Sequence, residues 1–534
     1  MYNPIKATAS GRSAKQQVST GGTKGLNLLT ASEFLDDKQL LACENYFVEQ
    51  EGKLIKRKGL RETFTVAGGY SPSMIKAWTD TIWVYAYNKT VAVYNATTGV
   101  HTVVKDDFTT ADPFTGARYG DFFFVCNGGD KIGRIALSGY GYTELTDAPK
   151  AKVLAIIGTR LYAGNLSGTI VGGGSGDVST VVWAEQDTGG ATPFTNWTTT
   201  ATPPEMDDPA SLRFRNAKEV KAILPDIDGK ITVLFDSGET GFTSEALNVD
   251  GVGIAQDTKT AYERISYGSE IGAISTPFGI FYVNESGLWT LGYGESKQIS
   301  QVLGEEFIDD IDFTDADLVY DDVKQNIYVT CRNQGSSFNN LVIYYNLSNK
   351  SFGTITGWKI RRFMKIGKTI YGTDSLTTSV WELFYGSNDN GNPIGTEWKK
   401  EFRGGSIDNL YALMETKVKG FISNGSSIRI HFDIYTKNGD YIKDFAQYGL
   451  SYGGIVAITE GFNDLGFNDG GFENSAITTN LIETRCSRRT RIREFSRLIV
   501  RITSNDVYPH EINWIYLMFM DKGFNRKNNY LTKL

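Results

Sequence analysis

Histidine is scarce in this chain, and so are the short motifs that mark common active sites. Only three histidines occur among 534 residues, His101, His431 and His510, and no two of them have the spacing of metal ligands. No P-loop, GxSxG or HExxH motif is found. The sequence therefore predicts no catalytic residues, no metal site and no cofactor, and we expect that the protein is not an enzyme.

Cysteine and long apolar runs are scarce as well. The four cysteines, Cys43, Cys126, Cys331 and Cys486, form no CxxC pair, which predicts reduced and buried thiols. No window approaches the ~18 apolar residues of a membrane-spanning helix. The opening residues also lack the apolar core of a secretion signal. We expect no membrane-spanning segment, and assembly in a cytoplasm.

Charge of either sign is modest. The formal net charge is −7, and charged residues make up 22% of the chain. A sequence-specific DNA-binding module would carry a basic face, so the composition disfavours that class of protein. A mildly negative protein can still form a passage for DNA, because like charges keep phosphates from adhering to the wall.

Glycine and aromatic residues, by contrast, are abundant. The 58 glycines and the 13% of aromatic residues are typical of short strands joined by tight turns. Residues 46–400 contain a series of predicted hairpins. The stretch TIWVYAYNKTVAVYN alternates on both sides of Asn88, and YGDFFFVCNGGDKIGRIAL turns at Asn127. The sequence thus predicts an all-β protein.

The hairpins recur about every 40–50 residues, which is the period of β-propeller blades. In two of the later ones a strand bearing Trp289 or Trp381 follows the hairpin tip. A bulky side chain there would fill the wedge between neighbouring sheets of a propeller. We predict a degenerate β-propeller of about six blades over residues 46–400. An irregular array of β-sandwiches is the alternative.

The two ends of the chain differ from this middle. Residues 1–45 are predicted to form a polar arm and one short helix that ends near Asn45, because Thr30 and Glu33 make a T-x-x-E capping box. Residues 401–534 hold longer strands and a basic tail, which indicates a C-terminal β-sandwich or jelly-roll-like domain. Two alternating series would line strand faces there: Ile428, Ile430, Phe432 and Ile434, and Ile512, Trp514, Tyr516 and Met518.

Three segments are candidates for contacts with partners. The acidic run 305–322 is predicted to be an exposed loop between blades; the alternative is that it faces the passage or a partner's basic patch. Arginines that alternate on a strand suit a neighbouring subunit's carboxylates, and exposed phenylalanines in a loop suit a partner protein. The candidates in these two segments are Arg489, Arg491 and Arg493, and Phe462, Phe467 and Phe472.

Two stretches resemble the tail nozzle proteins of short-tailed bacteriophages, also called tail tubular or phage-stabilisation proteins. In residues 25–60 a predicted helix leads into an Asn-aromatic pair and a strand that ends in a basic-Gly turn. Residues 371–402, YGTDSLTTSVWELFYGSNDNGNPIGTEWKKEF, resemble the family's last blade and its exit into the C-terminal unit. The matching positions in the first stretch are Asn45, Tyr46, Phe47, Gly52, Lys56, Arg57, Lys58 and Gly59, with Lys58 where the family commonly has proline.

The resemblance implies a structural virion protein in the phage tail, assembled in the host cytoplasm. Its protomers would form a homo-hexameric ring below the portal and adaptor rings and continue the channel for genome exit. Fibres, spikes or a needle would attach to this ring, and viral DNA would pass through without sequence-specific contacts. The residues implied as candidates for the interface are Asn45, Tyr46, Phe47, Lys56, Arg57 and Lys58.

Two other functions stay open from the sequence. A carbohydrate-binding propeller or receptor-binding module would need aromatic-plus-polar pockets repeated in equivalent blades, and no such repeat is found. A propeller glycan hydrolase would need two carboxylates that converge across the axis. Light scattering separates the ring from the binding module, and glycan turnover would support the hydrolase.

Overall fold

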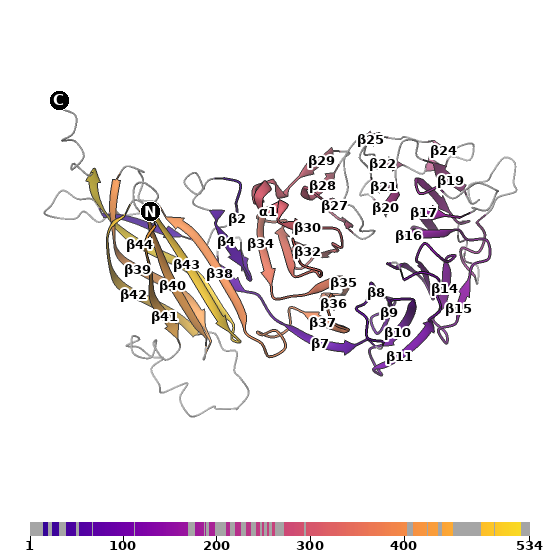
Figure 1. The fold of residues 1–534 in the computed structure, drawn as a ribbon, viewed down its shortest axis with the longest axis horizontal. Helices are drawn as coiled ribbons and strands as arrows, with labels where there is room; N and C mark the ends of the chain where they lie inside the picture. Colours follow the sequence, from indigo (N-terminus) through magenta and orange to yellow (C-terminus); the bar gives the residue numbers. More distant parts are fainter. Residues whose placement is uncertain are drawn as a thin grey trace.

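The protein is almost entirely β in its computed structural model (Figure 1). The described strands run from β1 (Ala14–Ser19) to β44 (His510–Phe524), with one 3-10 turn, η2 (Ser300–Leu303), and one short helix, α1 (Glu305–Asp309). The structure describes residues 14–19, 24–30, 39–49, 53–66, 68–111, 113–168, 177–185, 187, 189, 192–197, 210–213, 219–225, 231–236, 242–245, 248–249, 254–255, 259–261, 272–292, 295–402, 409–423, 426–435, 441–451, 482–495 and 497–524. The all-β prediction is confirmed for this part of the chain.

Antiparallel four-stranded sheets follow one another along the middle of the chain. The first sheet contains β8 (Met74–Ala77), β9 (Ile82–Tyr87), β10 (Thr90–Asn95) and β11 (Val100–Lys105), and the second contains β12 (Thr115–Tyr119), β13 (Phe122–Cys126), β14 (Gly133–Ala136) and β15 (Tyr142–Glu144). The third sheet contains β16 (Lys150–Ile157), β17 (Arg160–Ser167), β18 (Thr180–Trp183) and β19 (Ala210–Arg213), and the fourth contains β20 (Glu219–Pro225), β21 (Ile231–Asp236), β22 (Phe242–Glu245) and β25 (Lys259–Ala261). The fifth sheet contains β26 (Ala273–Thr276), β27 (Gly279–Asn284), β28 (Gly287–Gly292) and β29 (Glu295–Gln298). A small pair, β23 (Asn248–Val249) with β24 (Ile254–Ala255), accompanies the fourth sheet in sequence.

Two further sets of four strands complete this series. Strands β31 (Leu318–Asp321), β32 (Asn326–Asn333), β33 (Leu341–Asn346) and β34 (Ser351–Thr356) pair in order, and β30 (Ile311–Asp312) also pairs with β32. The last set is β35 (Ile360–Ile366), β36 (Thr369–Asp374) and β37 (Ser379–Leu383), completed by the early strand β7 (Leu60–Thr65). Residues far apart in sequence therefore share the last sheet.

The contacts between these sheets follow a circular order, and this group of sheets is called the circle. The first strand of each set contacts the first strand of the next, in the order β8, β12, β16, β20, β26, β31 and β35, and β35 contacts β8. A separate hydrophobic cluster lies between each pair of neighbouring sheets. In the cluster between the last sheet and the first, Phe64 of β7 stacks on Tyr94 of β10 with ring centroids 3.9 Å apart. The apolar faces of the sheets are therefore buried against one another around the circle.

Both tryptophans singled out in the sequence lie on the third strand of a four-stranded sheet. Trp289 of β28 and Trp381 of β37 are half-buried. Each donates its indole N–H to a side chain at the end of the preceding strand, to Asn284 Oδ1 at 2.9 Å and to Asp374 Oδ2 at 3.1 Å. The same device thus recurs in two sheets of the circle.

The C-terminal strands form a second unit beside the circle (Figure 1). Its strands are β38 (Ile394–Phe402), β39 (Asn409–Ile422), β40 (Ser427–Tyr435), β41 (Tyr441–Ser451), β42 (Ile482–Phe495), β43 (Arg497–Asp506) and β44. One sheet contains β38, β43, β40 and β41, and the other contains β42, β39 and β44. A single hydrophobic cluster holds residues from both sheets, so the two sheets pack face to face.

Early strands of the chain connect the two units. The strands concerned are β2 (Gly25–Leu26), β3 (Gln39–Leu40), β4 (Ala42–Glu44), β5 (Tyr46–Val48) and β6 (Leu54–Lys56). Strand β4 pairs in parallel with β34 of the circle and antiparallel with β38 of the C-terminal unit. Strand β6 pairs with β44, and β5 pairs with β6. One continuous sheet therefore runs from the circle through β4 into the C-terminal unit, whereas β5 and β6 extend the other sheet of that unit.

The helix predicted to end near Asn45 is wrong in its second half. Residues 39–40 and 42–44 are strands, and residues 31–38, which include Glu33, lie outside the described residues. Leu40 and Cys43 are both buried in the core of the C-terminal unit. Pairing with β34 and β38 satisfies the backbone there, and this tertiary gain overrides a local helical pattern. The described α-helix lies instead at Glu305–Asp309, inside the acidic run.

Candidate functional site

Asn45 lies at the meeting point of the early strands, the circle and the C-terminal unit. Its backbone adopts the left-handed conformation, with φ of 57°. The side-chain oxygen accepts hydrogen bonds from Arg57 Nε at 2.6 Å and from the Thr356 N–H at 3.1 Å. The amide nitrogen donates to the Gly395 carbonyl at 2.6 Å and to Thr356 Oγ1 at 2.9 Å. One buried amide thus joins β34, the start of β38 and the segment that follows β6.

Arg57 extends this network to the loop before β38. Its guanidinium makes a two-point ion pair with Asp389, with Nη1–Oδ1 at 2.8 Å and Nη2–Oδ2 at 2.6 Å. It also donates to the Thr356 carbonyl at 3.0 Å and lies over the ring of Trp358, 4.6 Å from the centroid. The Arg57 side chain is 1% exposed. Planar, bidentate pairing and aromatic stacking are specific to arginine, so lysine could not replace it here.

A second buried network ties the early strands to β44. Lys56 Nζ donates to Asp506 Oδ1 at 2.6 Å and to the Tyr508 carbonyl at 3.0 Å. The Tyr46 hydroxyl and His510 Nε2 are 2.8 Å apart. Burial, with the nearby Lys56 charge, lowers the pKa of His510 to about 3, so the ring is neutral at pH 7.

Four of the interface candidates are therefore used inside the chain. Asn45, Tyr46, Lys56 and Arg57 are all at most 4% exposed. As contacts to a neighbouring subunit these four predictions are wrong, because their polar atoms already bond to other segments of the same chain. The basic-aromatic pattern marked an internal joint, which sequence alone does not distinguish from a binding surface.

Phe47 and Lys58 lie at the edge of a cleft of about 700 Å³ between the circle and the C-terminal unit. Phe47 is half-buried, and Lys58 is exposed. The ammonium of Lys324 lies 4.6 Å from the ring centroid of Phe47 and 4.3 Å from that of Phe384. The sequence did not single out Lys324 or Phe384, which come from the turn before β32 and the residue after β37. Lys324 and Phe384 meet at the ring of Phe47, which the early strand β5 places beside them.

The remaining interface candidates are described only in part. Arg489, Arg491 and Arg493 all lie on β42, which is the last described strand at one side of its sheet. Phe462, Phe467 and Phe472 lie outside the described residues. These contacts stay predictions.

The acidic run is only partly an exposed loop. Asp317 and Asp321 are 5% exposed, and Asp315 forms ion pairs with Arg361 and Arg362. Glu305 and Glu306, by contrast, are exposed in the first turn of α1. The expectation of one continuous exposed loop is wrong, because β30 and β31 bring half of the run into the sheets.

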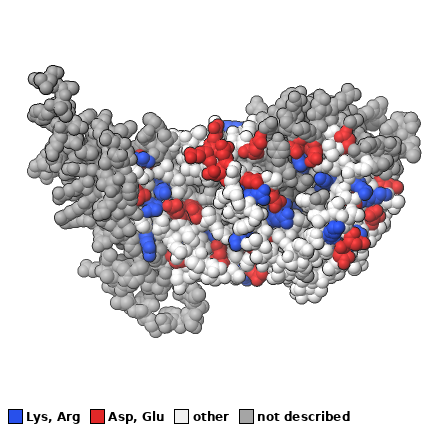
Figure 2. All heavy atoms as spheres, viewed as in Figure 1, with Lys and Arg blue, Asp and Glu red and all other residues white. Residues whose placement is uncertain are grey.

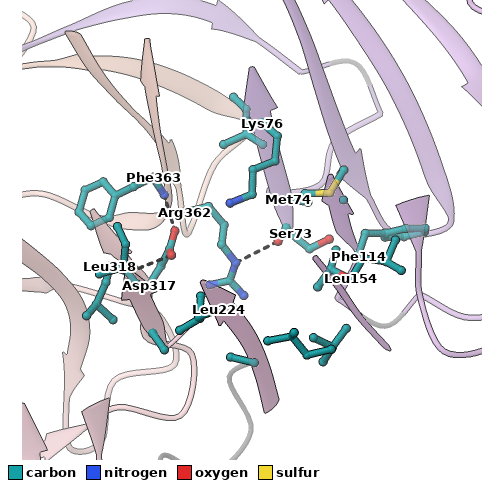
Figure 3. A pocket seen from close by; sticks show the side chains of 18 of the residues that line it. Ser73, Met74, Lys76, Phe114, Leu154, Leu224, Asp317, Leu318, Arg362 and Phe363 are labelled. Atoms are coloured by element: carbon teal, nitrogen blue, oxygen red, sulfur yellow. Dashed lines mark hydrogen bonds between the residues drawn. The ribbon is translucent and has the colours of Figure 1, made fainter. Parts of the chain in front are cut away.

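A cavity of about 260 Å³ lies on the axis of the circle, lined by residues at or beside the first strand of every sheet (Figure 3). Asp317 and Arg362 face it from adjoining strands. Asp317 accepts the N–H groups of Leu318 at 2.9 Å and Phe363 at 2.6 Å, and Arg362 Nε donates to the Ser73 carbonyl at 2.9 Å. These bonds connect β31, β35 and the segment that enters β8.

The charges around the cavity are mostly neutralised in place. Burial raises the pKa of the Asp317 carboxyl, against the opposing charges of Lys76 and Arg362. Burial would also raise the pKa of Asp315, but Arg362 and Arg361 outweigh it and hold that pKa below its ordinary value. Among the described residues that line the cavity, Asp317 is the one carboxylate. A two-carboxylate glycosidase mechanism would need a second one.

Metal ligands, membrane spans and reactive thiols are the other features with a chemical role that this part of the chain could hold. Within the described residues no group of three or more His, Cys, Asp or Glu side chains could hold a metal ion. No described helix is long and apolar enough to cross a membrane. Among the described residues Cys43, Cys126 and Cys331 are buried thiols that form no disulfide bond, as predicted.

Comparisons with known proteins leave the family open. No family model matches the chain, and no curated protein matches it. One similar solved structure is a chain of the mitotic checkpoint complex, with 11% identity, a TM-score of 0.38, and coverage of 61% of this chain and 92% of that one. Another is the extracellular domain of a putative hybrid two-component system from B. thetaiotaomicron, with 10% identity, a TM-score of 0.39, and coverage of 60% and 39% respectively. Likeness at this level has no bearing on function.

Proposed function

We propose that the chain is a structural protein of a virion, the protomer of the tail nozzle ring of a short-tailed bacteriophage. In this proposal it has no catalytic activity. The ring continues the channel for DNA below the portal and adaptor rings and anchors fibres, spikes or a needle.

One observation carries most of the support. The two stretches that resemble the nozzle family, residues 25–60 and 371–402, touch each other at the Arg57–Asp389 pair and at the bond from Asn45 to Gly395. A chance resemblance in two segments more than 300 residues apart would have no reason to fall on the two sides of one buried joint. The matching residues Asn45, Lys56 and Arg57 are also those whose polar atoms are buried in that region.

The proposed architecture is a β-propeller of seven blades joined to a β-sandwich. Its support is the circle of contacts between first strands, the hydrophobic cluster between each pair of neighbouring sheets, and the completion of the last sheet by β7. In this proposal the propeller has seven blades, whereas the sequence predicted about six. When an early strand such as β7 completes the last sheet, the first and last sheets are held together by backbone pairing within one sheet.

A rigid, tube-forming role agrees with how the two units are joined. Among the described residues, the sheet that continues through β4 and the buried network around Arg57 join the circle directly to the C-terminal unit. The axial cavity of about 260 Å³ is far too small for DNA, whose major groove alone is about 12 Å wide. In this proposal DNA therefore passes between protomers and not through the axis of one.

The decisive experiment is to image the purified protein by negative-stain electron microscopy, alone and with the adaptor ring, and to measure its mass by light scattering. The proposal predicts a closed ring with a central hole, with a mass that is an integral multiple of the 59.0 kDa chain, six being expected. A chain that stays solitary even beside tail partners would overturn the proposal. Turnover of a glycan would also overturn it and favour the hydrolase.

A further inference from the structure

The cleft between the circle and the C-terminal unit presents two ammonium groups, Lys58 and Lys324, that repel each other electrostatically, and Asp321 offsets this only through a longer-range attraction to Lys324. Lys58 and Lys324 are both exposed, and neither forms an ion pair with a described residue. Two other charges at the cleft differ from them: Lys56 is paired with Asp506, and Glu511 is paired with Lys53. Glu49 also lines the cleft and is exposed. Two neighbouring cations that form no ion pair with a described residue favour an acidic occupant.

The same cleft offers an apolar surface beside these cations. Val323 is 60% exposed, and Phe47 is half-buried under the Lys324 ammonium. Apolar surface ringed by charge is typical of a protein contact rather than of a site for a small inorganic ion. An occupant should therefore supply both carboxylates and apolar side chains.

A surface of that kind exists elsewhere on this chain, around α1. Figure 2 shows acidic side chains gathered where Figure 1 places this helix. Four exposed carboxylates that form no ion pair with a described residue lie together here: Glu305, Glu306, Asp309 and Asp310. Leu28 and Leu29, which are 37% and 52% exposed, lie beside the same turn, where their N–H groups bond to the Val302 carbonyl. This α1 surface is therefore opposite in charge to the cleft, and like the cleft it exposes apolar side chains.

The two surfaces lie at opposite ends of strand β32. Asn326, at its start, lines the cleft, whereas Arg332, near its end, pairs with Asp312 of β30 just after α1. The strand has eight residues and is therefore about 26 Å long. That separation exceeds the screening length of about 8 Å at physiological salt, so the two surfaces cannot neutralise each other within one chain.

We propose that the α1 surface of a second copy of this chain docks in the Lys58–Lys324 cleft. The contact joins different faces of the two copies, and such heterologous contacts build rings when their rotation closes. This inference rests on the proposed function, for which it names the contact between protomers. Glu305 and Glu306 approach Lys58 and Lys324, while Leu28 and Leu29 approach Val323 and Phe47.

Two charge-reversal variants test the proposal. The first carries Glu305→Lys and Glu306→Lys, and the second carries Lys58→Glu and Lys324→Glu. Each variant alone places like charges together, so its self-association in sedimentation velocity should weaken by on the order of 100-fold or more. In an equal mixture of the two variants every contact is again between opposite charges. The mixture should therefore assemble as the unchanged chain does, which also shows that both variants are folded.

A matched control carries the same change in charge on a distant sheet. Glu144 and Asp147 are exposed beside β15, and the variant Glu144→Lys with Asp147→Lys should associate like the unchanged chain. The variant Glu49→Gln should associate more tightly than the unchanged chain. It removes from the cleft a carboxylate that would repel Glu305 and Glu306 of the second copy. Full association of either reversal variant, or failure of the mixture to assemble, would overturn the docking proposal while leaving the ring itself intact. An unchanged chain that never self-associates would overturn both.

Discussion

Arg57 and Asp389 are 332 positions apart in the sequence and form a two-point ion pair with N–O distances of 2.8 and 2.6 Å. The arginine follows β6, which pairs with β44 of the C-terminal unit, and the aspartate lies in the loop between the last sheet of the circle and β38. Asn45 and Trp358 hold the guanidinium from its other sides. The pair thus lies where the two units of the protein meet, and its loss should be felt in both.

The first prediction concerns this ion pair. Asp389→Ala leaves the Arg57 charge buried without its partner, which should lower the free energy of unfolding by about 3–5 kcal/mol. Urea unfolding followed by tryptophan fluorescence measures the loss, and Trp358 beside the pair is a local reporter. The matched control is Glu382→Ala, which breaks the pair of Glu382 with the half-exposed Arg61. That change should cost about 0–1 kcal/mol. Equal losses in the two variants would contradict the role assigned to the buried pair.

The second prediction separates the two contributions of Asn45. Asn45→Gly keeps the left-handed backbone accessible but removes four hydrogen bonds, and should cost about 2–4 kcal/mol. Asn45→Ala removes the same bonds and adds a backbone penalty of about 1–2 kcal/mol. Alanine should therefore unfold at a lower urea concentration than glycine. The reverse order would show that the positive φ is not a constraint at this position.

The third prediction tests closure of the circle by β7. Phe64 packs against Trp83, Tyr85 and Tyr94 of the first sheet although its strand belongs to the last sheet. Phe64→Ala should cost about 3–5 kcal/mol, because it opens a cavity at the junction. Hydrogen exchange should show the loss first in β7 and β8. The control Phe278→Ala, at a ring that is 52% exposed, should change the stability by no more than about 0.5 kcal/mol.

The fourth prediction is a dependence of stability on pH through His510. The folded pKa of about 3 lies below the ordinary value of 6.5, so the unfolded chain binds the proton more readily between these values. This histidine therefore costs the fold nothing above pH 6.5. It removes up to about 1.4 kcal/mol per pH unit as the pH falls from 6.5 towards 3.

His510→Gln keeps a polar side chain beside Tyr46 and removes this titration. The variant should be less stable than the unchanged chain at pH 7, but the difference should shrink or reverse towards pH 4. Thermal unfolding at matched ionic strength measures both curves. Parallel curves across this range would contradict the assignment.

Local patterns predicted the hairpins well. The turn at Asn88 lies between β9 and β10, and the turn beginning at Asn127 lies between β13 and β14. Ile428, Ile430, Phe432 and Ile434 are all buried along β40, as their alternation indicated. These features depend on turn chemistry and on the two-residue period of a strand, and both are local.

The last strand shows where alternation fails. The series from Ile512 to Met518 was expected on one face, yet Ile512 is followed in the core by Ile515 and Leu517. The pairing with β39 shifts between Lys419 and Gly420, whose partners are Trp514 and Ile512. One extra residue in β44 thus forms a bulge that moves the following side chains to the other face. A bulge of this kind depends on the partner strand and leaves no mark in the alternation itself.

Composition and spacing determined that this protein is all-β, where many of its turns fall, and which aromatic and basic residues matter. Only the tertiary structure decided that Asn45 and Arg57 face inward, that β7 completes the last sheet, and that the early strands connect the circle to the C-terminal unit. Turns and strand faces follow from interactions between near neighbours along the chain. Partners such as Asp389 lie hundreds of residues away, and only folding of the whole chain brings them within bonding distance.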